Sequence, residues 1–168
     1  GVLHLLEPDA PRGQRLPIDF FLRALAADRQ ERAIGVILSG MGSDGTLGLR
    51  AIKENAGAVF VQDPASAKFD GMPRSAIDAG LADVVAPAAE LAERIVAYLN
   101  HVPLLSAPAT VPLSDKDQSG LEKVVLILRA QTGHDFSLYK KSTLYRRIER
   151  RMGLHQLPKL ADYGCYLR

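Results

Sequence analysis

Short apolar runs alternate with segments of helical spacing through residues 1–100, and this alternation limits the fold more than any other feature. The longest run, residues 33–39 (AIGVILS), is continuous and β-branched, which suits a strand buried in a parallel sheet. Further strands are expected at residues 2–6, 58–62 and 83–86. Helices are expected at residues 18–28, 46–55, 73–79 and 87–100. The pattern predicts an α/β fold, a doubly wound, mostly parallel sheet with helices on both faces.

The rest of the chain has a different character. Residues 101–117 hold three prolines and no periodicity, which is the composition of a linker. Residues 118–168 are helical in pattern, with Ser119 and Glu122 spaced as a capping box, and predict a small all-α module. Residues 1–100 carry 10 Lys/Arg and 13 Asp/Glu, a net charge of −3, whereas residues 101–168 carry 11 and 6, a net of +5. This asymmetry indicates two parts with different partners.

The bulk properties set some limits on location. Cys165 is the single cysteine, so no internal disulfide can form, and a reducing, cytoplasmic location is expected. No apolar run approaches the roughly 18 residues of a membrane span, so no direct membrane insertion is expected. The chain begins Gly-Val-Leu-His, so we expect an excerpt from a longer protein, with a sheet truncated on its N-terminal side. A truncated sheet exposes an apolar edge, and a marginally stable fragment is expected.

The turn at residues 40–45 (GMGSDG) is the sharpest local feature. It follows the strand at 33–39, and in open α/β sheets ligands and catalytic groups gather at the carboxyl ends of strands. Its three glycines permit a tight turn, and Asp44 is its one ionisable group. Three roles are open to Asp44: a cap on the following helix, a carboxylate that orients a histidine in a Ser-His-Asp triad, or part of an anion site. The turn has neither Walker-loop nor dinucleotide spacing.

Several motifs in the first hundred residues resemble one family. They are residues 35–50 (GVILSGMGSDGTLGLR), 62–77 (QDPASAKFDGMPRSAI), 79–83 (AGLAD) and 15–21 (RLPIDFF). Together they resemble the C-terminal half of the catalytic domain of CheB-type receptor methylesterases. The resemblance implies a doubly wound α/β fold and hydrolysis of methyl esters on receptor glutamates by a serine, a histidine and an aspartate.

The resemblance also implies roles for particular residues. The family's aspartate falls on Asp44, and the substrate-pocket candidates are Met41, Gly42, Met72 and Arg74. The family's serine and histidine lie earlier in its chain, and nothing ahead of residue 40 matches them. We therefore expect residues 1–168 alone to be catalytically inactive. His4, Ser39 and Ser43 are expected to have packing, surface, backbone or capping roles, and no metal site is predicted.

A basic helix is expected at residues 143–154. At 100° per residue, Leu144, Ile148 and Met152 fall on one side. The arginines on the other side are Arg146, Arg147, Arg150 and Arg151. This face fits three interpretations: a solvated surface, an acidic protein partner or a nucleic acid. Arginine pairs bidentately with carboxylates and phosphates, and the nearby aromatic residues do not form an RNA-reading motif.

A second family resemblance bears on this helix. Residues 132–152 (TGHDFSLYKKSTLYRRIERRM), 161–163 (ADY) and 166–168 (YLR) resemble the all-helical N-terminal subdomain of CheR-type receptor methyltransferases. The resemblance implies that the four arginines face the acidic helical bundle of a methyl-accepting chemotaxis receptor, with no nucleic acid expected. It also implies S-adenosylmethionine as cofactor of a catalytic domain that follows this subdomain, so we expect residues 1–168 to bind no cofactor.

Together these resemblances imply a chemotaxis signalling protein of the two-component, phosphorelay type. It would join a protein-glutamate methylesterase, at residues 1–100, to a methyltransferase that starts at residue 118. Two alternatives stay open. One is a non-catalytic receptor-binding scaffold, which an upstream serine and histidine would exclude. The other is a basic helical nucleic-acid binder, which would show steep salt dependence on arbitrary DNA.

Overall fold

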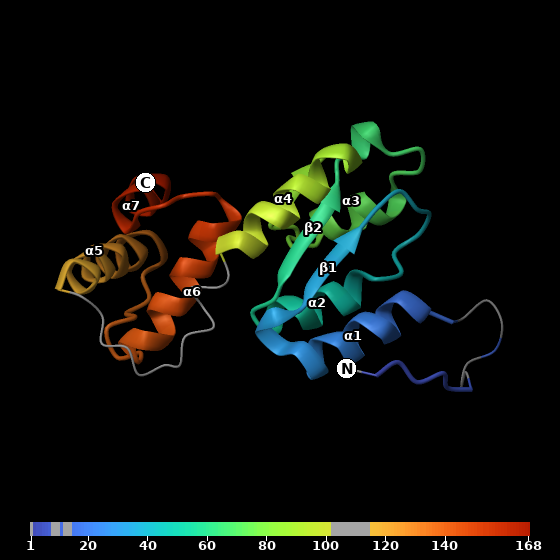
Figure 1. Ribbon diagram of the computed structural model, residues 1–168, viewed down its shortest axis with the longest axis horizontal. Helices are drawn as coiled ribbons and strands as arrows, with labels where there is room; N and C mark the ends of the chain where they lie inside the picture. Colours follow the sequence, from blue (N-terminus) through green and yellow to red (C-terminus); the bar gives the residue numbers. More distant parts are fainter. Residues whose placement is uncertain (1, 8–10, 12–14, 102–114) are drawn as a thin grey trace. The chain divides into compact units, whose positions relative to one another are not determined.

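The computed structural model describes residues 2–7, 11, 15–101 and 115–168 (Figure 1). The chain divides into two compact units, residues 1–93 and 94–168, each with its own elements. The first unit is an α/β structure and the second is helical, which confirms the predicted fold class.

The first unit contains a parallel sheet and the helices that cover it (Figure 1). In chain order its elements are α1 (Pro17–Arg29), the 3-10 helix η1 (Gln30–Arg32), β1 (Ile34–Ile37), α2 (Thr46–Glu54), β2 (Ala58–Gln62), the 3-10 helix η2 (Pro64–Ser66), α3 (Gly71–Asp78) and β3 (Val84–Ala86). Helix α4 (Ala88–His101) starts in this unit and continues past its boundary. Pro17 begins α1 because its fixed φ suits the first helical position, where its missing N–H is not needed.

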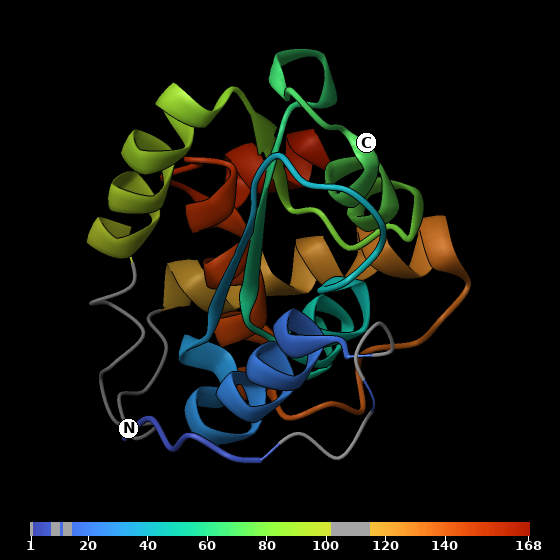
Figure 2. The ribbon, with the colours of Figure 1, turned by 90° about the vertical axis from the view of Figure 1, so that its right-hand side faces the viewer.

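The sheet has the order β1-β2-β3 and is parallel throughout. One face carries Ile37, Val59 and Val61, which form the main core with side chains from α1, α2 and α3. All five residues of β2 are buried, so its other face is covered too, and Figure 2 shows the beginning of α4 on that side of the strands. Val36 of β1 pairs with Phe60 and is still 39% exposed, so this face is less well covered at β1 than at β2.

After the end of α4, the described part of the second unit, residues 115–168, contains α5 (Asp115–Thr132), α6 (Lys141–Leu154) and α7 (Leu160–Tyr166). They enclose a core of buried side chains, Leu121, Val124, Leu144, Ile148, Met152 and Tyr163. Gly133 has a φ of 74° immediately after α5, which is the left-handed conformation that ends many helices. Leu144, Ile148 and Met152 of α6 belong to this core, so the apolar stripe predicted for that helix packs as expected.

Several local predictions were wrong. Residues 2–6 form no strand, since Val2, Leu3 and Leu5 are at least 78% exposed and gain no partner strand or burial. Pro73 is the third residue of α3, not the first, and Ser119 lies inside α5. Most of the predicted linker, residues 102–114, lies outside the described residues, and α5 already begins at Asp115.

Candidate functional site

The glycine-rich turn at residues 40–45 lies at the carboxyl end of β1, where the sheet fold places ligand sites. Gly42 and Gly45 have φ values of 82° and 100°, in the region that favours glycine. A Cβ atom at Gly45 would also lie 3.0 Å from both Ile18 and Ile37, so the turn packs tightly between α1 and β1. The glycines thus allow Asp44 to reach the first turn of α1.

Asp44 caps helix α1. Its Oδ1 accepts a hydrogen bond from the backbone N–H of Asp19 at 2.9 Å, and its Oδ2 accepts one from the N–H of Ile18 at 3.2 Å. These donors are among the N–H groups of a helix start that have no partner within the helix. Each carboxylate oxygen keeps capacity for a further donor, and the side chain is half-buried. The carboxylate is fixed in place and still accessible.

Asp19 in turn caps helix α2. Its Oδ1 accepts a hydrogen bond of 2.7 Å from the N–H of Gly48, and its side chain is buried. A Cβ at Gly48 would lie 2.5 Å from Leu22 Cβ and 3.1 Å from the carbonyl oxygen of Asp19, so glycine is needed for this close approach. Sequence reasoning missed Asp19, because an acidic residue in a first helical turn is common and signals no particular partner.

The other side of the turn is held by the segment that leads into α3. Gly40 donates its N–H to the carbonyl of Phe69 at 2.9 Å and accepts from the N–H of Met72 at 2.9 Å. Ser39 Oγ accepts from the N–H of Phe69 at 2.9 Å. The buried Gln62 supports this arrangement, since its Oε1 accepts from the N–H of Ser39 at 2.8 Å. Gln62 was also missed by sequence reasoning, as a glutamine at a strand end carries no distinctive signal.

The predicted pocket residues have different surroundings. Met41 is 74% exposed, and an added Cβ at Gly42 would meet no atom within 4 Å, so both present open surface. Met72 packs on the core and directly against Gly40, where an added Cβ would lie 2.3 Å from its sulfur. Arg74 is exposed and pairs through Nε with Asp70 Oδ2 at 2.6 Å, a contact that lowers the pKa of Asp70 and raises that of Arg74. The structure thus brings Met72 to the turn and holds Arg74 in an ion pair on α3.

Ser43 and His4, neither of which is expected to be catalytic, make backbone contacts or lie on the surface. Ser43 accepts a hydrogen bond from the N–H of Thr46 through its backbone carbonyl, at 3.2 Å. Thr46 Oγ1 lies 2.8 Å from Ser75 Oγ, which ties the start of α2 to α3. His4 belongs to the exposed residues 2–7, remote in sequence from the turn. These positions agree with the expected backbone and surface roles.

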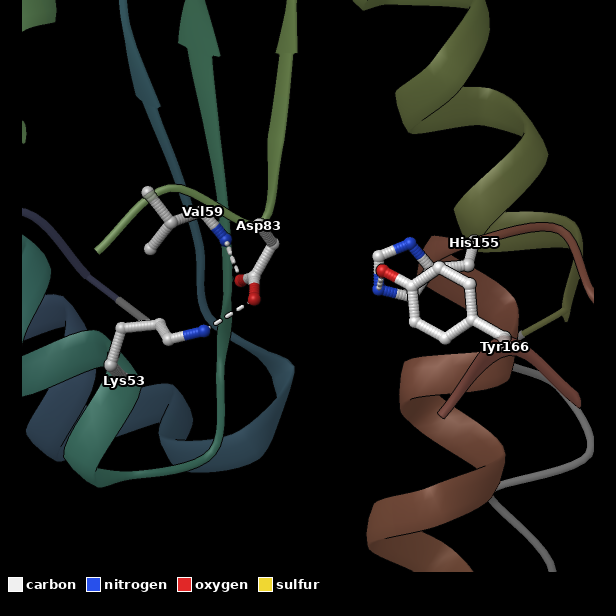
Figure 3. Close-up of polar contacts among 5 residues, drawn as sticks. All are labelled: Lys53, Val59, Asp83, His155 and Tyr166. Atoms are coloured by element: carbon white, nitrogen blue, oxygen red, sulfur yellow. Dashed lines mark hydrogen bonds and ion pairs between the residues drawn. The ribbon is translucent and has the colours of Figure 1, made fainter. Parts of the chain in front are cut away.

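A buried ion pair anchors the amino end of the sheet. Asp83, which precedes β3, accepts from Lys53 of α2 and, at 2.9 Å, from the N–H of Val59 (Figure 3). The Asp83 side chain is 2% exposed and that of Lys53 is 26% exposed. This pair lies at the end of the strands opposite to the glycine-rich turn, so its role is to fix α2 and β3 to β2.

Helix α6 presents fewer exposed arginines than predicted. Arg147 and Arg151 are exposed and Arg146 is half-buried, but Arg150 is only 9% exposed. The prediction of four arginines on one open face was therefore wrong for Arg150. Beside the end of α6, the rings of His155 and Tyr166 pack against each other at a tilt of 33°, with their centroids 4.6 Å apart (Figure 3).

The helical unit also contains a groove of about 800 Å³ between α5, α6 and α7. Burial, and then the charge of Asp117, raise the pKa of Glu149 in this groove. Burial and the charge of Glu149 raise the pKa of Tyr145. The ionisable lining residues include Asp117, Lys123, Tyr145, Glu149, Lys159 and Arg168.

The described residues contain neither a metal-ligand cluster nor a membrane-spanning helix. Among residues 2–7, 11, 15–101 and 115–168, no group of three or more histidine, cysteine or acidic side chains is arranged to hold a metal ion. In the same part of the chain, no helix combines the length and apolar character needed to cross a membrane.

Comparisons with known proteins identify relatives of both units. A family model described as CheB methylesterase matches residues 3–95, and one described as the all-alpha domain of CheR methyltransferase matches residues 119–168. The "Uncharacterized 104.1 kDa protein in hypE 3'region" of Rhodobacter capsulatus is 40% identical over 92% of the chain. The protein-glutamate methylesterase/protein-glutamine glutaminase of Moorella thermoacetica is 50% identical over 49% of the chain. The chain spans 19% of the length of each of these two relatives.

Among solved structures, the CheB methylesterase catalytic domain of Thermotoga maritima is 40% identical to the chain. The match covers 46% of this chain and 41% of that one, with a TM-score of 0.46.

Proposed function

The chain belongs to the CheB methylesterase family and also carries the all-alpha domain of CheR methyltransferases, and from this premise we propose that it is the junction of a bifunctional chemotaxis adaptation protein. In this proposal the esterase hydrolyses methyl esters on receptor glutamates, and the methyltransferase forms them. Joining the two activities on one chain holds both near the same receptor and raises their effective concentration there.

Asp44 is the residue proposed to serve the esterase. A serine attacks the ester carbonyl, a histidine takes the serine proton, and Asp44 orients that histidine and stabilises its imidazolium. The serine and histidine are proposed to come from a part of the protein outside residues 1–168. One observation carries the proposal: both oxygens of Asp44 are fixed by the N–H groups of Ile18 and Asp19, yet the carboxylate keeps acceptor capacity at the carboxyl end of β1.

The test is methanol release from a methylated receptor by the full-length protein that carries residues 1–168. Asp44→Asn is expected to lower kcat on the order of 10³- to 10⁴-fold, because the histidine loses its orienting charge. Glu54→Gln removes one negative charge at the far end of α2, as Asp44→Asn does at the turn, so it is the matched control and is expected to retain full activity. Unchanged kcat in the Asp44 variant would exclude Asp44 from the triad, and no methanol release by the unaltered full-length protein would leave the non-catalytic scaffold as the better account.

The exposed arginines of α6 are proposed to bind the acidic helical bundle of a methyl-accepting chemotaxis receptor. Arg147 and Arg151 are exposed on a helix whose other side is buried against α5 and α7, and guanidinium groups pair bidentately with carboxylates. The double variant Arg147→Glu/Arg151→Glu is expected to weaken binding to a receptor cytoplasmic fragment at least about 10-fold, since each reversal adds a like-charge contact.

Arg129→Glu is the control for that experiment, because Arg129 is an exposed arginine on α5 that pairs with Asp135 at 3.3 Å. This variant also replaces an exposed arginine with a glutamate, but on α5 instead of α6, so it tests whether the position of the reversed charge matters. Binding to arbitrary DNA that is stronger than receptor binding, with a steep salt dependence, would support the nucleic-acid alternative instead.

S-adenosylmethionine is the cofactor proposed for the methyltransferase activity of the whole protein. Residues 1–168 carry no glycine-rich loop of the kind that binds such a cofactor. We therefore expect isothermal titration of residues 1–168 with S-adenosylmethionine to show no saturable binding. Saturable binding would contradict this expectation.

A further inference from the structure

We infer that Asp19 is a positioning residue for the esterase, acting through Asp44. The inference rests on the proposed function, because it assumes that Asp44 orients a catalytic histidine. Asp19 contributes at two points: its backbone N–H donates to Asp44 Oδ1 at 2.9 Å, and its side-chain Oδ1 accepts from the N–H of Gly48 at 2.7 Å. Asp44 and Gly48 lie on either side of the start of α2. The two hydrogen bonds therefore connect the Asp44 carboxylate to α1, and α1 back to α2, and we call this closed set of contacts the Asp19 circuit.

This circuit explains why a half-exposed turn can hold a carboxylate in one place. The donors to Asp44 are backbone atoms of α1, so the carboxylate moves whenever the start of α1 moves. The buried side chain of Asp19 prevents that movement by fixing the start of α1 to the start of α2. Catalytic groups need placement within fractions of an ångström, and a shift of 1 Å can lower a rate about 100-fold.

Gly48 is the second component of the circuit. An added Cβ there would lie 2.5 Å from Leu22 Cβ and 3.1 and 3.2 Å from the backbone of Asp19. A side chain at position 48 therefore pushes α1 away from α2 while leaving both carboxylates chemically intact. Gly48→Ala and Asp19→Ala disturb the same contact from opposite sides.

The test measures kcat and KM for methyl-ester hydrolysis by the full-length protein. Asp19→Ala is expected to lower kcat on the order of 10- to 100-fold with little change in KM, because the Asp44 carboxylate loses its fixed position. Asp19→Asn is expected to restore most of the activity, since its amide oxygen can still accept from the N–H of Gly48. Asp28→Ala, at the exposed end of α1, is the matched control and should retain wild-type kcat.

A double-mutant cycle separates positioning from general stabilisation. In an Asp44→Ala background, Asp19→Ala should lower kcat no further, because the group that it positions is gone. Equal losses from Asp19→Ala in both backgrounds would overturn the inference and assign Asp19 to folding alone. Full activity of a folded Asp19→Ala variant would also overturn it.

Two further outcomes are distinguishable. If Asp44→Ala itself retains kcat, the proposed function fails, whatever Asp19 does. If Asp19→Ala does not fold, Gly48→Ala serves in its place: a lowered kcat that vanishes in the Asp44→Ala background supports the inference, and an unchanged kcat overturns it.

Discussion

Asp44 and Asp19 cap each other's helices: Asp44 accepts from the N–H of Asp19 at the start of α1, and Asp19 accepts from the N–H of Gly48 near the start of α2. The arrangement satisfies three N–H groups that have no partner within their own helices. Through these hydrogen bonds the turn at residues 40–45, the candidate catalytic segment, also connects the start of α1 to the start of α2.

Replacing Asp44 with alanine should therefore destabilise the α/β unit independently of any catalytic role. Two N–H groups, those of Ile18 and Asp19, lose their acceptor, and the loss of a helix cap costs about 1–2 kcal/mol. The measurement is amide hydrogen exchange, in which these two amides should exchange faster while the core strand β2 stays protected. Unchanged protection at Ile18 and Asp19 would contradict the cap.

The pair formed by Lys53 and Asp83 gives a second prediction. Asp83→Ala removes the acceptor for Lys53 Nζ and for the N–H of Val59 at a site where the Asp83 side chain is 2% exposed. The buried N–H of Val59 is left without this acceptor, which costs about 1–3 kcal/mol, whereas the partly exposed Lys53 ammonium still has access to water. Urea denaturation of residues 1–168 should show this loss. Asp63→Ala, which affects only the short 3-10 helix η2, should cost far less.

Much of the fold could be predicted from the sequence because its signals are local. Pro17, Gly80 and Gly133 mark helix ends by backbone restrictions that act within a few residues, and each behaves as its residue type dictates. The strands at residues 34–37 and 58–62 follow from continuous apolar runs. The run at residues 2–6 shows the limit of this reasoning, since an apolar segment forms a strand only where a neighbouring strand can pair with it.

The details of the site could not be predicted, because they depend on contacts between distant segments. A cap on the following helix was one of the three roles left open for Asp44, but its donors lie 25 and 26 residues earlier in the chain. That pairing exists only once α1 has packed on α2. Arg150 fails for a related reason: helical periodicity gives the direction of a side chain relative to the core, not whether another part of the molecule covers it.

Gly164 in α7 offers a stabilising change. An added Cβ would make an ordinary contact with Ile127 Cδ1 at 3.5 Å, and glycine inside a helix is about 0.5–1 kcal/mol less stable than alanine. Gly164→Ala should therefore raise the free energy of unfolding by up to about 1 kcal/mol. Gly120→Ala in α5 is the contrasting variant, because its Cβ would lie 3.0 Å from Leu160 and the crowding offsets the gain. Thermal unfolding of the two variants should separate them, and equal melting temperatures would contradict the packing argument.

Glu149 makes the stability of the helical unit depend on pH. Burial, followed by the charge of Asp117, raises the pKa of Glu149 in the folded protein above its unfolded value. The folded state then binds the proton more tightly, so stability falls as pH rises through the unfolded and folded pKa values and stays low above both. Glu149→Gln removes the charge at constant shape and should raise the melting temperature at pH 7. The advantage should disappear below about pH 4, where the wild-type carboxyl is protonated in both states.

The matched control for Glu149→Gln is Glu122→Gln on α5. Glu122 is exposed and pairs with Lys141 Nζ at 2.9 Å, so losing its charge removes a surface ion pair of the kind that contributes about 0–1 kcal/mol. Its melting temperature at pH 7 should stay unchanged or fall slightly, the opposite direction to Glu149→Gln. If both variants shift in the same direction, the effect comes from the net charge of the unit and not from the burial of Glu149 beside Asp117.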